Sequence, residues 1–565
     1  MAQIGVEAYL TFSDFNGGKR ASLEDFRADL VRYRREDIVR FCVFTNNAIY
    51  GLDPDPSRSA HLEIVRNACL PQTLSLDLAA KLISGTLFHR QQLLFVAKEA
   101  LLICSSAGLP LAPGWNLTRL FLKANDQNVD VPVSQSIKKN ETLALLANFI
   151  PVVEANRFST FQPKFTRPLI LLNRIMPTYG DSPPFDLGRL FIEATGFEPD
   201  EYFGLLFAAL TASSRFKVED LLRNPETFGL DSGFLIESRF TKEQLERFLL
   251  DVSANAEEYR ATLNGLNRGL FDFTCFKDRP LFREGTKVFP VDFHFLGARC
   301  ESALYWKSLE RLSERDKDKF RSFWGDLFQR YINWMLARFV DGDLNKFTAE
   351  PTFDGTMEEV CDGLIVSGSS AVLLEYKGGL LAANAKYEGD LEKLRSNLEK
   401  KFVGTQDNRK GVLQLVNSID LLFSGAKRVI SGVDASNITK IYPVLVIHDD
   451  IGGAWMMNAY LNERFKTLSR GRFRRLSNRN GSKVTVTPLF CISVDHFEIV
   501  AEALASERLT DILEARYRGD RELRLAFLTA PNSVLGESAR RIPKFLNEEM
   551  REFTNRLKEK FDRSA

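Results

Sequence analysis

Residues 360–378 read VCDGLIVSGSSAVLLEYKG, and the interpretation of the rest of the chain depends on this stretch. Two apolar segments, 359–366 and 370–377, have the length and side-chain types of buried strands. Ser367-Gly368-Ser369 between them is typical of a tight turn, because glycine accepts backbone conformations that other residues avoid. The stretch therefore predicts a β-hairpin with a buried body.

Polar side chains stand at one end of this hairpin. Side chains alternate between the two faces of a strand, so Glu375 and Lys377 point the same way while Tyr376 points the opposite way. A turn near Gly368 brings Asp362, near the start of the first strand, back beside the end of the second. Two carboxylates and an ammonium group then converge at one end of a small sheet.

These groups predict a site for metal-assisted attack on a phosphodiester. Mg²⁺ prefers hard oxygen ligands, so Asp362 and Glu375 are the predicted metal ligands, with the backbone carbonyl of Tyr376 as a third. The ion would polarise the phosphoryl group and acidify a bound water. Lys377 is expected to position or deprotonate that water, or to offset charge in the transition state. A simple salt bridge between acid and lysine is the alternative.

The elements around the hairpin predict an α/β domain. A broad apolar stripe predicts a long helix at about 314–340, and an earlier hairpin is centred on Glu284–Gly285. After residue 378 the patterns predict, in order, a charged helix at about 388–403, an apolar helix at 411–423, a strand at 441–449, a helix from about Trp455 and a strand pair within 483–494. Strands that alternate with helices after a leading helix indicate an α/β domain over residues 280–505.

Both flanking regions are predicted to be helical. Residues 1–279 show helical spacing of apolar side chains, with capping signals at Ser22 and Thr241. Gly196 is expected to end one helix and Pro199 to begin the next. Residues 506–565 form a charged helical tail. The expected fold class is α+β or α/β and multidomain: a helical N-terminal region, an α/β domain and a helical C-terminal tail.

Composition limits the classes of function. The chain has 565 residues and a formal net charge of +1, so binding of nucleic acid must depend on local clusters of charge. The seven cysteines are scattered without a CxxC pair, which argues against a zinc ribbon and fits a reducing cytosol. No stretch reaches the roughly 18 apolar residues that span a bilayer, and no signal-peptide pattern is present. A cytoplasmic protein without membrane contact is expected.

Asp362, the tripeptide Glu375-Tyr376-Lys377 and the order helix–strand–strand–helix resemble the PD-(D/E)xK, or restriction-endonuclease-like, nuclease superfamily. The resemblance covers about residues 280–505 and leaves out the helical first half. It implies a restriction-endonuclease-like domain and a DNA endonuclease, a hydrolase that uses Mg²⁺ or Mn²⁺. Glu399-Lys400-Lys401 also matches the tripeptide, but it lies in a polar helical stretch with no strand before it and is interpreted as a solvated face.

The sequence departs from the pattern of this superfamily at two positions. Cys361 stands where proline is common, and Gln329 stands on the leading helix where many members carry a metal-binding glutamate. A glutamine amide oxygen can bind a metal but adds no charge, which favours a single ion. Gln414, in the helix at 411–423, resembles the polar residue that often completes such sites. For both glutamines, an ordinary polar residue beside a core stripe is the alternative.

One segment carries a dense basic cluster. SRGRFRRLSNRNGSK contains no acid and has the side chains Arg470, Arg472, Arg474, Arg475, Arg479 and Lys483. Arginines bind phosphates through paired donors, and Phe473 could stack on a base. The segment is predicted to be a nucleic-acid-binding loop close to the metal site, with a solvated basic loop as the alternative.

Other signatures narrow the function further. The chain has no phosphate-binding GxxxxGK[ST] loop, and His448-Asp449-Asp450 is interpreted as a solvent-facing end of a strand. The expected function is DNA cleavage, with a bacterial defence effector against phage or foreign DNA as the suggested role. A regulatory protein partner, or self-association, is expected through the helical first half. Two alternatives stay open: a catalytically inactive nuclease fold that only binds, and an RNase with the same site.

Overall fold

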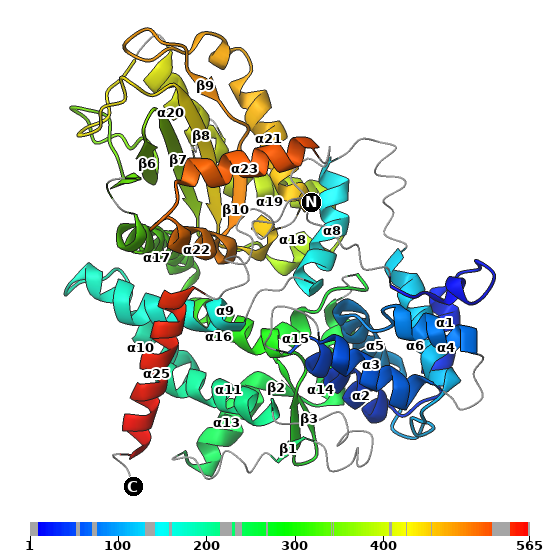
Figure 1. Cartoon of the computed structure of the whole chain (residues 1–565). Coiled ribbons are helices and arrows are strands. Elements are labelled where there is room, and N and C mark those ends of the chain that lie inside the picture. Colours follow the sequence, from blue (N-terminus) through cyan, green and yellow to red (C-terminus); the bar gives the residue numbers. More distant parts are fainter. Residues whose placement is uncertain are drawn as a thin grey trace.

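The computed structural model of the chain shows a mixed α/β protein with two separate sheets (Figure 1). It describes residues 9–51, 57–70, 76–129, 142–156, 161–214, 229–231, 240–266, 269–340, 342, 344–405, 410–424, 427–453, 455–522 and 543–562. The predicted coarse fold class is confirmed by this mixture of many helices and two sheets.

The first part of the chain is largely helical, as predicted. Its helices are α1 Leu23–Leu30, α2 Arg35–Ile49, α3 Arg58–Ile64, α4 Leu76–Ser84, α5 Arg90–Ile103, α6 Trp115–Val129, α8 Thr142–Asn156, α9 Phe161–Ile170, α10 Leu187–Thr195, α11 Pro199–Ser213, α13 Lys242–Val252 and α14 Ala256–Leu266. The predicted capping boxes form at Ser22 and Thr241, whose side chains accept backbone N–H groups three residues later. Gly196 ends α10 in the left-handed conformation (φ 79°), as expected of a C-terminal glycine.

The hairpin predicted around Glu284–Gly285 is present but belongs to a small sheet. Its strands are β3 Leu281–Glu284 and β4 Lys287–Pro290, and they pair antiparallel. β1 Leu230–Asp231 and β2 Ser253–Ala254 complete this sheet in the order β1-β4-β3-β2. The predicted boundary between residues 279 and 280 therefore cuts through one sheet.

The hairpin of residues 360–378 lies in the larger, six-stranded sheet. Its strands are β5 Lys346–Ala349, β6 Gly363–Ser367, β7 Ser370–Lys377, β8 Lys440–Ile447, β9 Thr485–Val486 and β10 Phe490–Ser493. The order is β10-β8-β7-β6-β5, with β9 also paired to β8. β6 and β7 pair antiparallel from Gly363 opposite Leu374 to Ser367 opposite Ser370, whereas β7 and β8 are parallel.

Helices cover both faces of this sheet (Figure 1). The helices of this part of the chain are α15 Thr274–Asp278, α16 Phe293–Glu310, α17 Glu314–Phe339, α18 Ala383–Tyr387, α19 Leu391–Leu398, α20 Val412–Phe423, α21 Trp455–Ser469, α22 Val494–Ala503, α23 Leu509–Glu522 and α25 Lys544–Asp562, of which α15 and α25 lie away from the sheet. Val372, Leu374 and Tyr376 of β7 share a core with α17, α22 and α23. Ala371 and Leu373, on the opposite face, share a core with α19, α20 and α21.

A buried ion-pair network joins the first half of the chain to the helices beside the sheet. Arg167 of α9 is 1% exposed and donates to Glu498 Oε1 at 2.8 Å, to Asp495 Oδ1 at 2.6 Å and to Glu301. Tyr331 of α17 donates to the same Glu498 oxygen at 2.6 Å. Helices α9, α16, α17 and α22 therefore meet around one guanidinium group.

Two further features concern the cysteines and the possibility of membrane-spanning helices. All seven cysteines are free and buried, which agrees with the absence of a disulfide framework in the sequence. Within the described ranges, no helix is both long enough and apolar enough to cross a membrane.

Candidate active site

The pairing of β6 with β7 places Asp362 beside Glu375. Gly363 lies opposite Leu374, so the same antiparallel register puts the preceding residue, Asp362, opposite Glu375. The Oδ2 atom of Asp362 accepts the backbone N–H of Tyr376 at 2.5 Å. The two carboxylates that the sequence predicted to converge therefore meet at one end of the sheet, Asp362 directly before β6 and Glu375 in β7.

Glu375 is fully buried and is held by two donors. Its Oε1 atom accepts Lys377 Nζ at 2.6 Å and the backbone N–H of Gly411 at 3.1 Å. Its Oε2 atom is buried and has no hydrogen-bond partner among the described residues. A buried carboxylate oxygen without a donor is costly, so this atom marks a position where a cation would be favourable.

The N–H of Gly411 reaches Glu375 because the backbone there takes a conformation reserved for glycine. Gly411 has φ 63° and precedes the first residue of α20. A Cβ atom on it would stand 2.0 Å from the carbonyl oxygen of Phe402 and 3.4 Å from Lys377 Cε. The N-terminus of α20 thus approaches the acid–lysine pair closely, and its partial positive charge faces Glu375.

The electrostatics of this cluster favour protonated acids. Burial, followed by the charge of Asp362, raises the pKa of Glu375 to about 8. Burial also raises the pKa of Asp362, although the Lys377 ammonium group opposes that rise. The same carboxylates raise the pKa of Lys377 against the effect of its own burial. With two acids and one ammonium group, the fully ionised cluster would carry excess negative charge, which the uptake of a proton or a cation would remove.

Two further acids belong to this cluster and were missed in the sequence. Burial and the charge of Asp362 raise the pKa of Glu359 to about 7, and its Oε1 atom is buried without a partner in the described chain. Glu350 is exposed, and its backbone N–H donates to the carbonyl of Asp362 at 3.1 Å. Glu359 lies three residues before Asp362 in the sequence, and this short spacing was the signal that could have placed Glu359 in the site.

The donor set fits a hard divalent cation in chemical type. Asp362 and Glu375 offer carboxylate oxygens. The N–H of Tyr376 donates to Asp362, and the N–H and C=O groups of a strand residue point to the same side. The carbonyl of Tyr376 is therefore also directed towards Asp362. The bond from Lys377 to Glu375 occupies one of these oxygens. In the described parts of the chain, no three His, Cys, Asp or Glu side chains are grouped so that together they could hold a metal ion.

The two predicted glutamines lie on helices that flank this cluster. Gln329 is half-buried on α17, the helix that packs against Gly378 so closely that a Cβ there would lie 2.9 Å from Phe328 Cβ. Gln414 is half-buried in the first turn of α20, three residues after Gly411. Within the described residues, neither glutamine is hydrogen-bonded to Asp362, Glu375 or Lys377.

The basic segment is not in contact with the carboxylates. Arg472 donates to Asn417 Oδ1 in the middle of α20 at 2.7 Å, and Ser477 N–H donates to the carbonyl of Phe423 at the far end of that helix. All six basic side chains are exposed. Phe473, expected to stack on a base, instead packs inward against Phe465, with ring centroids 5.9 Å apart.

The interpretation of His448-Asp449-Asp450 as a solvent-facing strand end is wrong. His448 is 5% and Asp449 2% exposed, because α9 and α16 cover the end of β8. His448 Nε2 lies 2.8 Å from Glu301 Oε1, while Asp449 accepts Lys386 and Asp450 accepts Lys164. Glu399 and Lys401 are not simply solvated either, since Glu399 binds Tyr460 and Arg464, and Lys401 binds the carbonyl of Leu380.

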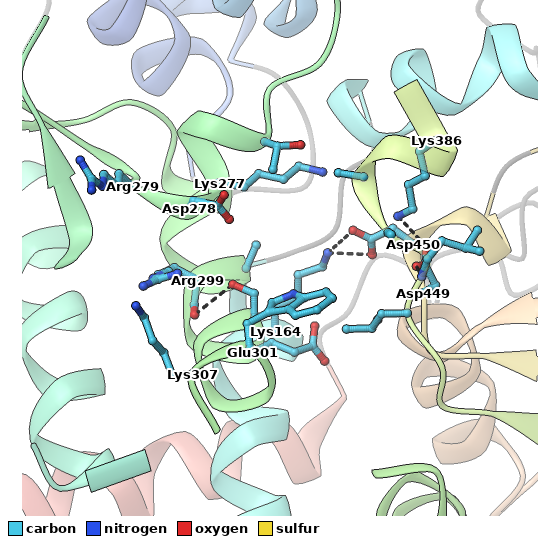
Figure 2. A pocket seen from close by; sticks show the side chains of 18 of the residues that line it. Lys164, Lys277, Asp278, Arg279, Arg299, Glu301, Lys307, Lys386, Asp449 and Asp450 are labelled. Atoms are coloured by element: carbon cyan, nitrogen blue, oxygen red, sulfur yellow. Dashed lines mark hydrogen bonds and ion pairs between the residues drawn. The ribbon is translucent and has the colours of Figure 1, made fainter. Parts of the chain in front are cut away.

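A cavity of about 580 Å³ opens beside these residues. Figure 2 shows Lys164 directed towards Asp450 and Lys386 towards Asp449, with Arg299 and Lys307 on the opposite wall. Asp251 pairs with both Arg299 and Lys307 at 2.8 Å, and these cations hold its pKa at about 2 in spite of burial. Six acids and six lysines or arginines line the cavity, so its charges are balanced in sign.

Comparisons with known proteins gave no relative: no family model, no curated protein and no solved structure matches this chain. Any function assigned to the Asp362–Glu375–Lys377 cluster must therefore be argued from the geometry of the cluster itself.

Proposed function

We propose that this protein is a metal-dependent nuclease that hydrolyses phosphodiester bonds of DNA at the end of β7. The observation that carries the proposal is the buried meeting of Asp362, Glu375 and Lys377, in which one carboxylate oxygen has no donor among the described residues. Structural ion pairs usually balance their charges, whereas this cluster holds more acid than base.

The chain's own groups account for binding and positioning. Asp362 and Glu375, with the Tyr376 carbonyl, would hold Mg²⁺ or Mn²⁺, which supplies polarisation of the phosphodiester and a more acidic water. A cation at the unpaired Oε2 atom would withdraw negative charge from Glu375 and so weaken the bond from Lys377 Nζ to Oε1. Lys377 would then be free to orient the attacking water or to offset charge on the phosphoryl oxygens. Its flexible stem makes that movement inexpensive.

The arrangement of elements supports the same proposal. α17 precedes the strands β5, β6 and β7, the helices α18, α19 and α20 follow them, and β8 adds a parallel strand beside β7. This order resembles the PD-(D/E)xK superfamily, in which the acids and lysine lie on such a strand pair. The resemblance is one of pattern, and the restriction-endonuclease-like assignment is part of the proposal.

Plasmid nicking is the direct test. Purified full-length protein should convert supercoiled plasmid to nicked or linear forms with Mg²⁺ or Mn²⁺, and not with EDTA. Lys377→Ala should abolish this conversion. Lys400→Ala is the matched control, because Lys400 is exposed and belongs to the second, helical copy of the tripeptide, so it should leave the rate unchanged.

Two outcomes would count against the assignment. Equal cutting by wild type and Lys377→Ala would remove Lys377 from the chemistry. Failure of the wild type to cut, with the fold intact by circular dichroism, would favour a binding protein with an inactive nuclease-like site. Labelled RNA and DNA oligonucleotides compared in the same reaction would identify an RNase, since the carboxylate cluster does not by itself distinguish the sugar.

A further inference from the structure

The basic loop, residues 470–483, is an exposed surface whose cations form no ion pair with an acid of the described chain, although Arg479 helps to lower the pKa of Asp434 from beyond ion-pair distance. Its cations are Arg470, Arg472, Arg474, Arg475, Arg479 and Lys483. No described carboxylate lies within ion-pair distance of any of them, and the neutral contacts are Arg472 to Asn417 and Arg479 to the carbonyl of Lys427. Elsewhere on this protein, exposed arginines such as Arg189 and Arg395 pair with acids on their own helix. The loop therefore presents six cations to solvent.

The loop is anchored firmly although its side chains are exposed. Asn478 donates to the carbonyl of Ile438 at 3.1 Å, and its own Oδ1 accepts Ser482 N–H at 2.9 Å. Phe473 and Leu476 pack into the core beside α21. Since the backbone is fixed at these points, the arginines project from a defined surface and not from a loose segment.

Helix α20 connects this surface to the carboxylate cluster. The N–H before its first turn donates to Glu375, its middle residue Asn417 accepts Arg472, and its last residue Phe423 accepts Ser477 N–H. Six residues separate Gly411 from Asn417, which corresponds to about 9 Å along a helix axis. The nearest arginine thus lies within a few nucleotides' length of the cluster.

Between Gly411 and Asn417, the half-buried face of α20 carries no negative charge that would repel a phosphate backbone. Gln414 and Asn417 are three residues apart and share a face, and both carry neutral amide groups. Lys410, exposed just before the helix, adds a positive charge at the cluster end and opposes the rise in the pKa of Asp362. The single acid of α20 is Asp420, which lies beyond Asn417. Because its negative charge would repel phosphates, a nucleic-acid strand is expected to leave the helix near Asn417 and continue onto the basic loop.

We propose that the basic loop is an exosite for a DNA strand, which runs from the carboxylate cluster along Gln414 and Asn417 and is held by Arg472, Arg474 and Arg475. The proposal rests on the proposed nuclease function and adds where the uncleaved part of the strand lies. It assigns Gln414 to the path of the strand and not to the metal.

This path sets a minimum length for tight binding. The whole of α20 is 12 residues, or about 18 Å, and a stacked strand advances about 3.4 Å per nucleotide. A strand that reaches both the cluster and the far arginines therefore needs roughly six nucleotides. Shorter strands can occupy the cluster or the loop but not both.

The test uses full-length Asp362→Asn protein, so that binding is measured without cleavage. Fluorescent single strands of about 4 and about 20 nucleotides are titrated over a range of salt. Arg472→Ala/Arg474→Ala/Arg475→Ala should weaken binding of the longer strand about tenfold or more near 0.1 M salt, and reduce the salt slope by about 2. It should leave the already weak binding of the shortest strand nearly unchanged.

The matched control is Arg315→Ala/Arg508→Ala/Arg551→Ala, which removes three exposed arginines from α17, α25 and the residue before α23. It changes the net charge equally and should change neither affinity nor slope. Equal weakening by both triple variants would mean a general charge effect, and no weakening by the loop variant would place the strand elsewhere; either result overturns the exosite.

Failure of the exosite and failure of the nuclease can be told apart. If wild-type protein does not cut DNA but the loop variant still loses length-dependent binding, the nuclease proposal fails and the loop remains a DNA site. If wild-type protein cuts and the loop variant cuts long and short strands with the same KM, the nuclease stands and the exosite fails.

Discussion

Lys377 Nζ lies 2.6 Å from Oε1 of Glu375, so the lysine closes the site on the same carboxylate that would have to hold a metal ion. The pair comes from a single strand, two residues apart, and both side chains are largely or fully buried. A closed pair of this kind is a resting arrangement in which the ammonium group neutralises one acid. A divalent cation at the unpaired Oε2 atom would compete with the ammonium group for the negative charge of Glu375, and the first prediction follows from that competition.

Magnesium should stabilise the fold through Asp362. A ligand present at about ten times its Kd stabilises the native state by about 1.4 kcal/mol, which would appear as a rise in Tm with Mg²⁺ concentration. Asp362→Asn keeps an acceptor for the Tyr376 N–H but removes the charge, so it should lose most of this rise. Scanning calorimetry with and without EDTA measures it. A rise of the same size in both proteins would place Mg²⁺ elsewhere.

Removal of the charge of Glu375 should flatten the pH dependence of stability. The pKa of Glu375 is raised to about 8 in the fold from an ordinary value near 4.5. Between these values the folded protein binds more protons than the unfolded chain, so the free energy of unfolding falls as pH rises from about 4.5 to about 8. Glu375→Gln keeps an oxygen that can accept the hydrogen bonds of Oε1, and it removes this contribution to the fall in the free energy of unfolding with pH.

The measurement is the Tm of metal-free protein at about pH 5 and about pH 8, where Glu375→Gln should lose less Tm than wild type by roughly 2 °C or more. Glu358→Gln is the control, because Glu358 is exposed and pairs only with Arg428 in the described chain. A wild-type protein whose stability rises between these two pH values relative to Glu375→Gln would contradict the prediction.

Glu359 should govern the acid side of the activity profile and not the maximal rate. Its pKa is raised to about 7 by burial and by Asp362, so its charge changes near neutral pH. Glu359→Gln fixes that position as neutral and should shift the acid limb of kcat/KM while changing the plateau by less than about tenfold. Asp362→Asn, in contrast, should lower the plateau by about a hundredfold or more. Nicking rates from about pH 5.5 to pH 9 separate the two effects.

Gly411→Ala should destabilise the fold through a steric conflict that Gly368→Ala does not create. Both glycines have positive φ, so both substitutions carry the backbone strain of about 1 kcal/mol. Only at Gly411 would the Cβ also meet a backbone carbonyl, 2.0 Å away, whereas nothing lies within 4 Å of a Cβ on Gly368. Urea unfolding should show a loss at least about 2 kcal/mol larger for Gly411→Ala. Equal losses would mean that the backbone near Phe402 yields easily.

The part of the site that could be predicted from the sequence is the part formed by residues close together in the chain. The strand period of two and the short Ser367-Gly368-Ser369 turn suffice to place Asp362 opposite Glu375, and the structure has this register. Helices α17, α20 and α21 were predictable for the same reason, because their apolar spacing is contained in one segment.

The remaining features depend on contacts between distant segments. Gly411 lies 36 residues from Glu375 and reaches it only through the packing of α20 on the sheet. His448 was expected at the surface because no local pattern reveals that α9 and α16, well over a hundred residues earlier, cover the end of β8. The basic loop was expected beside the predicted metal site because the sequence does not reveal which end of the sheet it reaches. The pairing of β9 with β8 holds the loop near the start of β8.

The three acids that surround Arg167 mean that the six-stranded sheet and the helices before it form one folding unit. A fragment that began at residue 280 would keep Glu301, Asp495 and Glu498 but lose the guanidinium group that lies among them. Removing one partner from a buried ionic group costs about 3–5 kcal/mol, a large share of the stability of an ordinary protein. Separate expression of residues 280–565 should therefore yield insoluble or partly unfolded protein, and the helical first half serves at least to keep the sheet and its covering helices folded.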